Sequence, residues 1–184
     1  MSWNRRIAAA AGSLLVLVAL GAADEMKSHE AGEIRFEAPA TWKTKPTKSA
    51  MRKAELEAPA AAGDKAPGEL VVFVFPKGAG TVEANIDRWA RMFKNADGDA
   101  PSAEVKQTKG KNVEVTRVEV AGRYVAPIFP GSPETYDEPN YRLFGAIVQT
   151  DSAGYFFKMV GPDKTMNAAR AGFDAMLASM TKKD

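Results

Sequence analysis

The chain has 184 residues, a formal net charge of +2 and no cysteine. Residues 1–23 hold two of the 25 Lys and Arg residues and none of the 23 Asp and Glu residues, so the remainder carries equal numbers of both signs. A groove for nucleic acid needs an excess of clustered Lys and Arg, so this composition disfavours a nucleic-acid partner. The absence of cysteine excludes disulfides, a thiol nucleophile and the lipid attachment of a bacterial lipoprotein.

The first 23 residues have the organisation of a secretory signal peptide. Arg5 and Arg6 precede an apolar run over 7–20, and Ala23 ends a short stretch of small residues after which cleavage is expected. No later segment approaches the roughly 18 apolar residues that a membrane-spanning helix requires. The sequence therefore predicts a secreted or periplasmic protein without membrane contact after cleavage. Retention of the signal as an anchor is the alternative.

Residues 24–33 are polar and are predicted to form a disordered tail before a single domain over 34–184. In that domain, apolar residues alternate with polar ones or run continuously in segments of strand length. These segments predict strands over 34–38, 50–57, 69–75, 103–108, 113–124, 141–149 and 155–160. In the fifth strand the apolar parity changes, which we interpret as a β-bulge near Thr116 and Arg117. Residues 150–154 join the last two strands as a hairpin.

Two segments have apolar residues at helical spacing. Thr81 is a candidate N-cap for the first helix, which is expected to end near Asn95. Its apolar face comprises Val82, Ile86, Trp89 and Phe93. Residues 164–180 form the second helix, with an apolar stripe suited to packing on a sheet. Strands, one helix, strands and a closing helix predict an α+β fold, with an antiparallel β-sheet flanked by helices.

Reactive residue types are scarce in the sequence. His29 is the only histidine and lies in the expected tail, so a Ser or Thr nucleophile lacks its usual base. Zinc and copper sites need several Cys or His ligands. The run 95–99 superficially resembles a calcium loop, but Ala100 and Lys106 stand where that loop needs Gly and Glu. The sequence therefore predicts a protein that is not an enzyme and has no metal or cofactor.

The proline-rich segment 125–140 is the best candidate for a functional surface, because long loops on a rigid scaffold often carry function. The candidate surface residues are Phe129, Glu134, Tyr136, Asp137, Glu138 and Tyr141. We predict that this loop contacts another protein. The sequence does not predict the oligomeric state. The alternatives are a weak small-ligand or cation site between this loop and the sheet, a carboxylate-based hydrolase, or an inert surface loop.

Two local signatures resemble the PsbP-like family, which includes the extrinsic photosystem II subunit and many secreted bacterial proteins. Residues 36–42 (FEAPATW) are similar to the family's opening strand, which runs through Pro into a turn with Trp. Residues 155–157 (YFF) lead into a closing helix that ends with Phe173, Met176, Leu177 and Ser179. The resemblance covers about 34–180. It implies a sandwich of antiparallel sheet and helices that acts as a non-catalytic binding or assembly factor on a protein or envelope component, with no photosynthetic role and no site residues.

Overall fold

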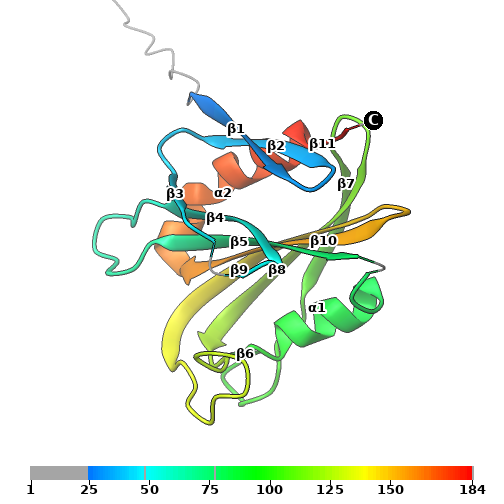
Figure 1. The fold of residues 1–184 in the computed structure, drawn as a ribbon. Coiled ribbons are helices and arrows are strands. Elements are labelled where there is room, and N and C mark those ends of the chain that lie inside the picture. The colour runs from blue at the N-terminus through cyan, green and yellow to red at the C-terminus, as the bar shows by residue number, and fades with distance from the viewer. Residues whose placement is uncertain (1–24, 48, 77, 184) are drawn as a thin grey trace, which may run out of the picture.

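The computed structural model describes residues 25–47, 49–76 and 78–183, so the predicted signal peptide lies outside the described residues. An antiparallel eight-stranded sheet forms the centre of the fold (Figure 1). Helix α2 and a small three-stranded sheet cover one face, and helix α1 lies on the other. The predicted α+β class, with an antiparallel sheet flanked by helices, is confirmed.

The large sheet has the order β3-β4-β5-β10-β9-β8, and β8 pairs with both β6 and β7 beyond that. Its strands are β3 (Lys43–Lys45), β4 (Arg52–Ala58), β5 (Gly68–Pro76), β6 (Phe93–Lys94), β7 (Glu104–Lys109), β8 (Glu114–Tyr124), β9 (Glu138–Gln149) and β10 (Ala153–Pro162). The predicted hairpin between the last two strands is confirmed, as β9 and β10 pair antiparallel along most of their length. Both are central and covered on two faces, which explains their nearly continuous apolar sequence.

The prediction of a disordered tail over 24–33 is wrong for the part of it that the structure describes, residues 25–33. Strand β1 (Met26–Ala31) pairs antiparallel with β2 (Ile34–Pro39), and β11 (Thr181–Lys182) adds to the other side of β2. As an edge strand, β1 is held by backbone hydrogen bonds and needs few apolar side chains. His29, placed in the tail by the sequence, stacks on Phe36 with 5.4 Å between ring centroids. Burial, and then the charge of Lys27, lower the pKa of His29.

Two hydrophobic cores lie on opposite faces of the large sheet. The first joins the sheet to β2 and to α2 (Asp163–Ser179), with Phe36 and Phe173 fully buried in it. The second lies beneath α1 (Val82–Ala90), where Trp89 lies directly over Gly145 of β9. A Cβ atom at position 145 would overlap the indole ring, so this glycine allows the close approach of helix and sheet. Neither helix is long and apolar enough to cross a bilayer, and the described residues contain no other α-helix.

The predicted first helix begins where expected but ends earlier. Thr81 is its N-cap, and the Thr81 Oγ1 atom accepts a hydrogen bond from the Ala84 amide at 3.1 Å. Phe93, predicted on the helical face, instead lies in β6 and pairs with Tyr124 of β8. It is nevertheless buried in the same core as the helix, which explains why its spacing imitated a longer helix.

The β-bulge predicted near Thr116 and Arg117 is also wrong. Strand β8 pairs regularly there, and its register shifts later, between Gly122 and Tyr124. Apolar residues of both parities occur because Val115 is buried on the α2 face and Val118 on the α1 face. A strand covered on both faces therefore needs no bulge to bury them.

Candidate functional site

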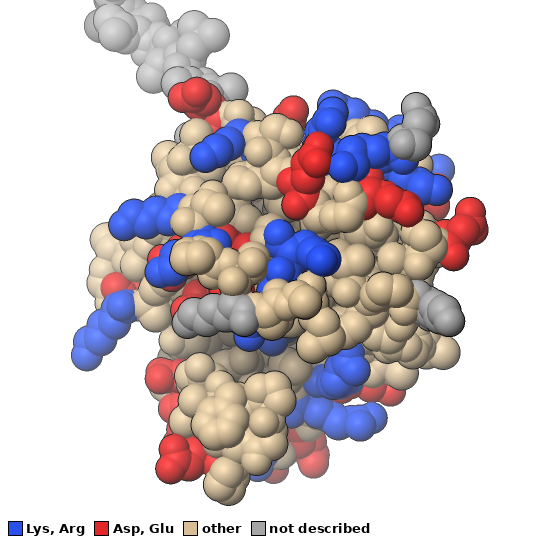
Figure 2. Space-filling model, in the orientation of Figure 1, with Lys and Arg blue, Asp and Glu red and all other residues tan. Residues whose placement is uncertain are grey.

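A groove of about 370 Å³ lies beside α1, between the proline-rich loop and strands β4, β5 and β10. In Figure 2 the loop forms the tan lobe at the bottom of the molecule, and the surface is hollowed above it. The residues that line the groove include Arg52, Glu69, Val71, Phe73, Tyr124, Ile128, Phe129, Tyr136, Lys158 and Val160. The groove thus combines apolar walls with a few charged groups, as small-ligand and peptide sites do.

The loop over 125–137 folds back on itself and has a defined shape. An isolated antiparallel bridge joins Pro127 to Thr135. The amide of Tyr136 donates to the Ala126 carbonyl at 2.9 Å. Because these contacts close the loop near its base, its tip is presented as a short hairpin-like projection.

Three of the six candidate surface residues are aromatic, and the structure brings them together at one end of the groove. Phe129 and Tyr136 line it and are 61% and 40% exposed. Tyr141 lies in β9 and stacks on Tyr124, with 5.9 Å between ring centroids. Burial, followed by the charge of Glu138, raises the pKa of Tyr141. Phe129 and Tyr136 thus line the groove, and Tyr141 contacts it only through Tyr124.

The three acidic candidates do not line the groove. Asp137 forms an ion pair with Arg123, and this guanidinium lowers the pKa of the Asp137 carboxyl. Glu138 is exposed at the start of β9, and the Glu134 carbonyl accepts a hydrogen bond from the Ile128 amide at 3.1 Å. Within the described residues, no group of three His, Cys, Asp or Glu side chains could hold a metal ion. Asp137 and the backbone of Glu134 therefore take part in contacts within or beside the loop, and Glu138 lies at its end.

Lys158 is one of three charged residues that line the groove, with Arg52 and Glu69, and none of the three was a candidate from the sequence. The Lys158 side chain extends from β10 and is mostly buried, and no hydrogen bond or ion pair joins its ammonium to any described residue. Burial, and then the charges of Arg52 and Arg88, lower its pKa, while Glu69 acts in the opposite direction. The available signal was a single charged residue within the otherwise uncharged strand Ala153–Pro162.

Arg52 reaches the groove because β4 contains a β-bulge. The register with β5 shifts between Arg52 and Ala54, which places Arg52 on the same face as Phe73. Its guanidinium carbon lies 5.6 Å from the centroid of the Phe73 ring. The same guanidinium pairs with Glu55 at 3.2 Å. The charge of Arg52 is thus already compensated, whereas that of Lys158 is not.

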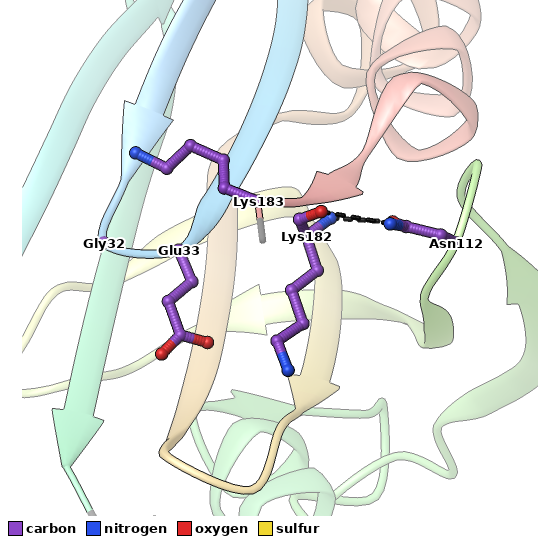
Figure 3. A pocket seen from close by; sticks show the side chains of 5 residues that line it. All are labelled: Gly32, Glu33, Asn112, Lys182 and Lys183. Atoms are coloured by element: carbon purple, nitrogen blue, oxygen red, sulfur yellow. Dashed lines mark hydrogen bonds between the residues drawn. The ribbon is translucent and has the colours of Figure 1, made fainter.

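A second pocket, of about 470 Å³, lies where the β1–β2 turn meets the C-terminal strand (Figure 3). It is lined by Gly32, Glu33, Asn112, Lys182 and Lys183. In Figure 3 the Glu33 and Lys182 side chains extend in the same direction, and Asn112 bonds to the backbone of Lys182. None of the lining side chains is apolar. This pocket therefore offers a ligand less apolar surface to bury than the groove does.

A cluster of charged residues lies beneath α2, on the opposite face of the sheet from the groove. Its centre is Glu119, which is 6% exposed and accepts hydrogen bonds from Arg117, Arg142 and Arg170. Burial would raise the pKa of Glu119, but the hydrogen bonds from the three arginines outweigh it and lower the pKa to about 2. Because the central carboxylate is fully occupied by protein donors, we interpret the cluster as structural.

The comparisons with known proteins identify the fold. The solution structure of cyanobacterial PsbP (CyanoP) from Synechocystis sp. PCC 6803 matches with a TM-score of 0.54, covering 91% of this chain and 98% of that chain at 12% identity. The PsbP-like sandwich predicted from the two sequence signatures is confirmed. No protein-family model and no curated protein matches the chain. At this identity the likeness shows the fold alone.

Proposed function

We propose that the protein is a non-catalytic binding or assembly protein that docks another protein through the tip of the proline-rich loop. The observation that carries the proposal is the exposure of Ile128, Phe129 and Tyr136 on a loop held by its own backbone hydrogen bonds. Aromatic side chains on pre-organised surfaces are the usual anchors of protein interfaces. The resemblance to the PsbP-like family, whose members generally act as non-catalytic binding factors, supports the same role.

The charges around the loop define the kind of partner. Glu134 and Glu138 are exposed beside the aromatic tip, and acidic side chains lie to either side of the tan lobe in Figure 2. An apolar centre with an acidic rim is complementary to an apolar pocket bordered by Lys or Arg. We expect association with such a partner to slow as salt is added, because rim charges act mainly on the association rate.

We further propose that docking takes place outside the cytoplasm, after removal of residues 1–23. The supporting feature is the sequence pattern of a signal peptide. Mass spectrometry of the protein from its native cells should then find a chain that begins at Asp24. A chain that retains Arg5 and Arg6 in the membrane fraction would instead support an uncleaved anchor.

The docking proposal is tested by capture of partners from an extract of the native cells with purified, immobilised protein. A double variant, Ile128→Ser with Phe129→Ser, removes the apolar tip and should reduce capture of the partner at least about tenfold, the loss expected for truncating an interface anchor. The matched control is Val105→Ser on β7, because Val105 is also exposed, at 44%, but lies away from the loop. Equal capture by wild type and the double variant would eliminate the loop as the docking surface.

A further inference from the structure

The chemistry of the groove indicates an occupant other than a folded protein. We infer that the groove binds a small organic carboxylate with an apolar chain, its carboxylate on the Lys158 ammonium and its chain along β5 and β10. The residues that carry this inference are those of β5 and β10 on the floor of the groove, and the groove shares Phe129 and Tyr136 with the proposed docking surface.

The charges around the groove favour an anionic ligand. Lys158 lines the groove, its side chain is mostly buried, and no described residue bonds to its ammonium, so an anion in the groove can pair with a cation that is already partly removed from water. Arg52 and Arg88 add positive potential at Lys158, and Glu69 only partly offsets it. The groove therefore favours a ligand with a single negative charge.

The remaining lining of the groove is mainly apolar and suits the chain of such a ligand. Val71, Phe73 and Val160 form an apolar surface next to Lys158 in the cross-strand register of β5 and β10. Phe129 and Tyr136 stand at the loop side of the same groove. A volume of about 370 Å³ accommodates a chain or ring of several carbons, and burial of each CH₂ group contributes about 0.8 kcal/mol to hydrophobic binding.

The same residues disfavour other ligand classes. A phosphate monoester carries nearly two negative charges and needs several donors, but the Arg52 guanidinium is engaged by Glu55. The Glu69 carboxylate would repel a second negative charge. A cationic ligand would be repelled by Lys158, whose surroundings are made more positive by Arg52 and Arg88. The combination of one free ammonium with apolar walls thus selects an amphipathic monocarboxylate.

The test compares three ligands with the same chain at neutral pH: octanoate, octan-1-ol and octylammonium. Isothermal titration calorimetry on the purified protein should find octanoate bound about tenfold more tightly than octan-1-ol, because a charge-assisted hydrogen bond is gained. Octylammonium should bind more weakly than either. In amide NMR spectra, the shifts caused by octanoate should concentrate on β5, β10 and the loop over 125–137.

The decisive variant is Lys158→Met, which keeps an apolar side chain of similar length. It should bind octanoate about tenfold more weakly than wild type and bind octan-1-ol at least as well, so binding of the alcohol also shows that the variant is folded. Lys106→Met is the matched control, because Lys106 lies on β7 and pairs with Glu104. Equal affinity of wild type for octanoate and octan-1-ol, no binding of octanoate, or unchanged octanoate affinity in Lys158→Met would overturn the inference.

Discussion

On the face of the large sheet that α2 covers, one buried carboxylate receives hydrogen bonds from three arginines; on the face that carries α1, a mostly buried lysine has no partner among the described residues. The Glu119 carboxylate is almost completely removed from water, whereas the mostly buried Lys158 still reaches solvent through the groove. We interpret the cluster at Glu119 as structural, and we propose that the ammonium of Lys158, which has no partner among the described residues, is where an anion binds.

The cluster beneath α2 also fixes the position of that helix. Arg142 donates to Asp163 at the start of α2 at 2.7 Å, and Arg117 donates to Asp174 further along the helix at 2.9 Å. Glu119 also pairs with both of these arginines. The helix is therefore linked to β8 through Arg117 and to β9 through Arg142, and both arginines share the Glu119 carboxylate. On the groove face, no hydrogen bond or ion pair among the described residues joins Lys158 to a comparable network, and the core beneath α1 is mainly apolar.

The largest effect is expected from Glu119→Gln. The substitution keeps the shape of the side chain but leaves three arginines without their common counter-charge, so it should destabilise the protein by about 3–5 kcal/mol. Urea unfolding at neutral pH measures the loss. Glu104→Gln is the control, since Glu104 forms an exposed pair with Lys106 and should cost at most about 1 kcal/mol. A loss at position 119 no larger than this control would show that the cluster contributes little to stability.

Acid should affect the cluster in a defined pH range. The pKa of Glu119 is about 2 in the folded protein against 4.5 for an ordinary Glu, so the unfolded chain binds the proton more readily. The stability contributed by Glu119 is then fully present above about pH 4.5 and is lost as the pH falls toward 2. The stability difference between wild type and Glu119→Gln should shrink over this range. A difference that stays constant would contradict the assignment.

On the groove face, the expected weak point is packing. Gly145→Ala places a methyl group against the Trp89 ring and should destabilise the protein by about 1–3 kcal/mol through overpacking. The double variant with Trp89→Leu tests the cause, because a smaller side chain relieves the overlap. If the two losses simply add, the overlap is not the reason for the glycine at position 145.

Much of this fold could be predicted from the sequence, and the missing parts share a physical cause. The central strands were found because covered strands must be apolar. Strands β1 and β3 were missed because they are exposed and polar, as in Lys43–Lys45, and depend on backbone pairing with a neighbour. The local pattern of apolar and polar residues does not specify the register of that pairing.

Of the residues that line the groove, some could be proposed from the sequence and others could not. Phe129 and Tyr136 were predicted because they stand in one contiguous proline-rich segment. Lys158 and Arg52 could not be assigned to the groove, because they come from strands far apart in the sequence. Arg52 depends in addition on a β-bulge that reverses which face its side chain occupies. Only the pairing of β4, β5 and β10 brings these two cations to the groove that Phe73 also lines.

The smallest expected effect has the opposite sign. Burial lowers the pKa of Lys158 below its ordinary value of 10.5, so its charged form destabilises the folded state at neutral pH. Lys158→Met should therefore stabilise the protein, by about 1 kcal/mol at pH 7. The gain should shrink as the pH rises toward 10.5, where the lysine becomes neutral in the unfolded chain as well. Urea unfolding at pH 7 and near pH 10 measures both. Destabilisation by this variant at pH 7 would mean that Lys158 is compensated within the fold, and the contrast between the two faces would disappear.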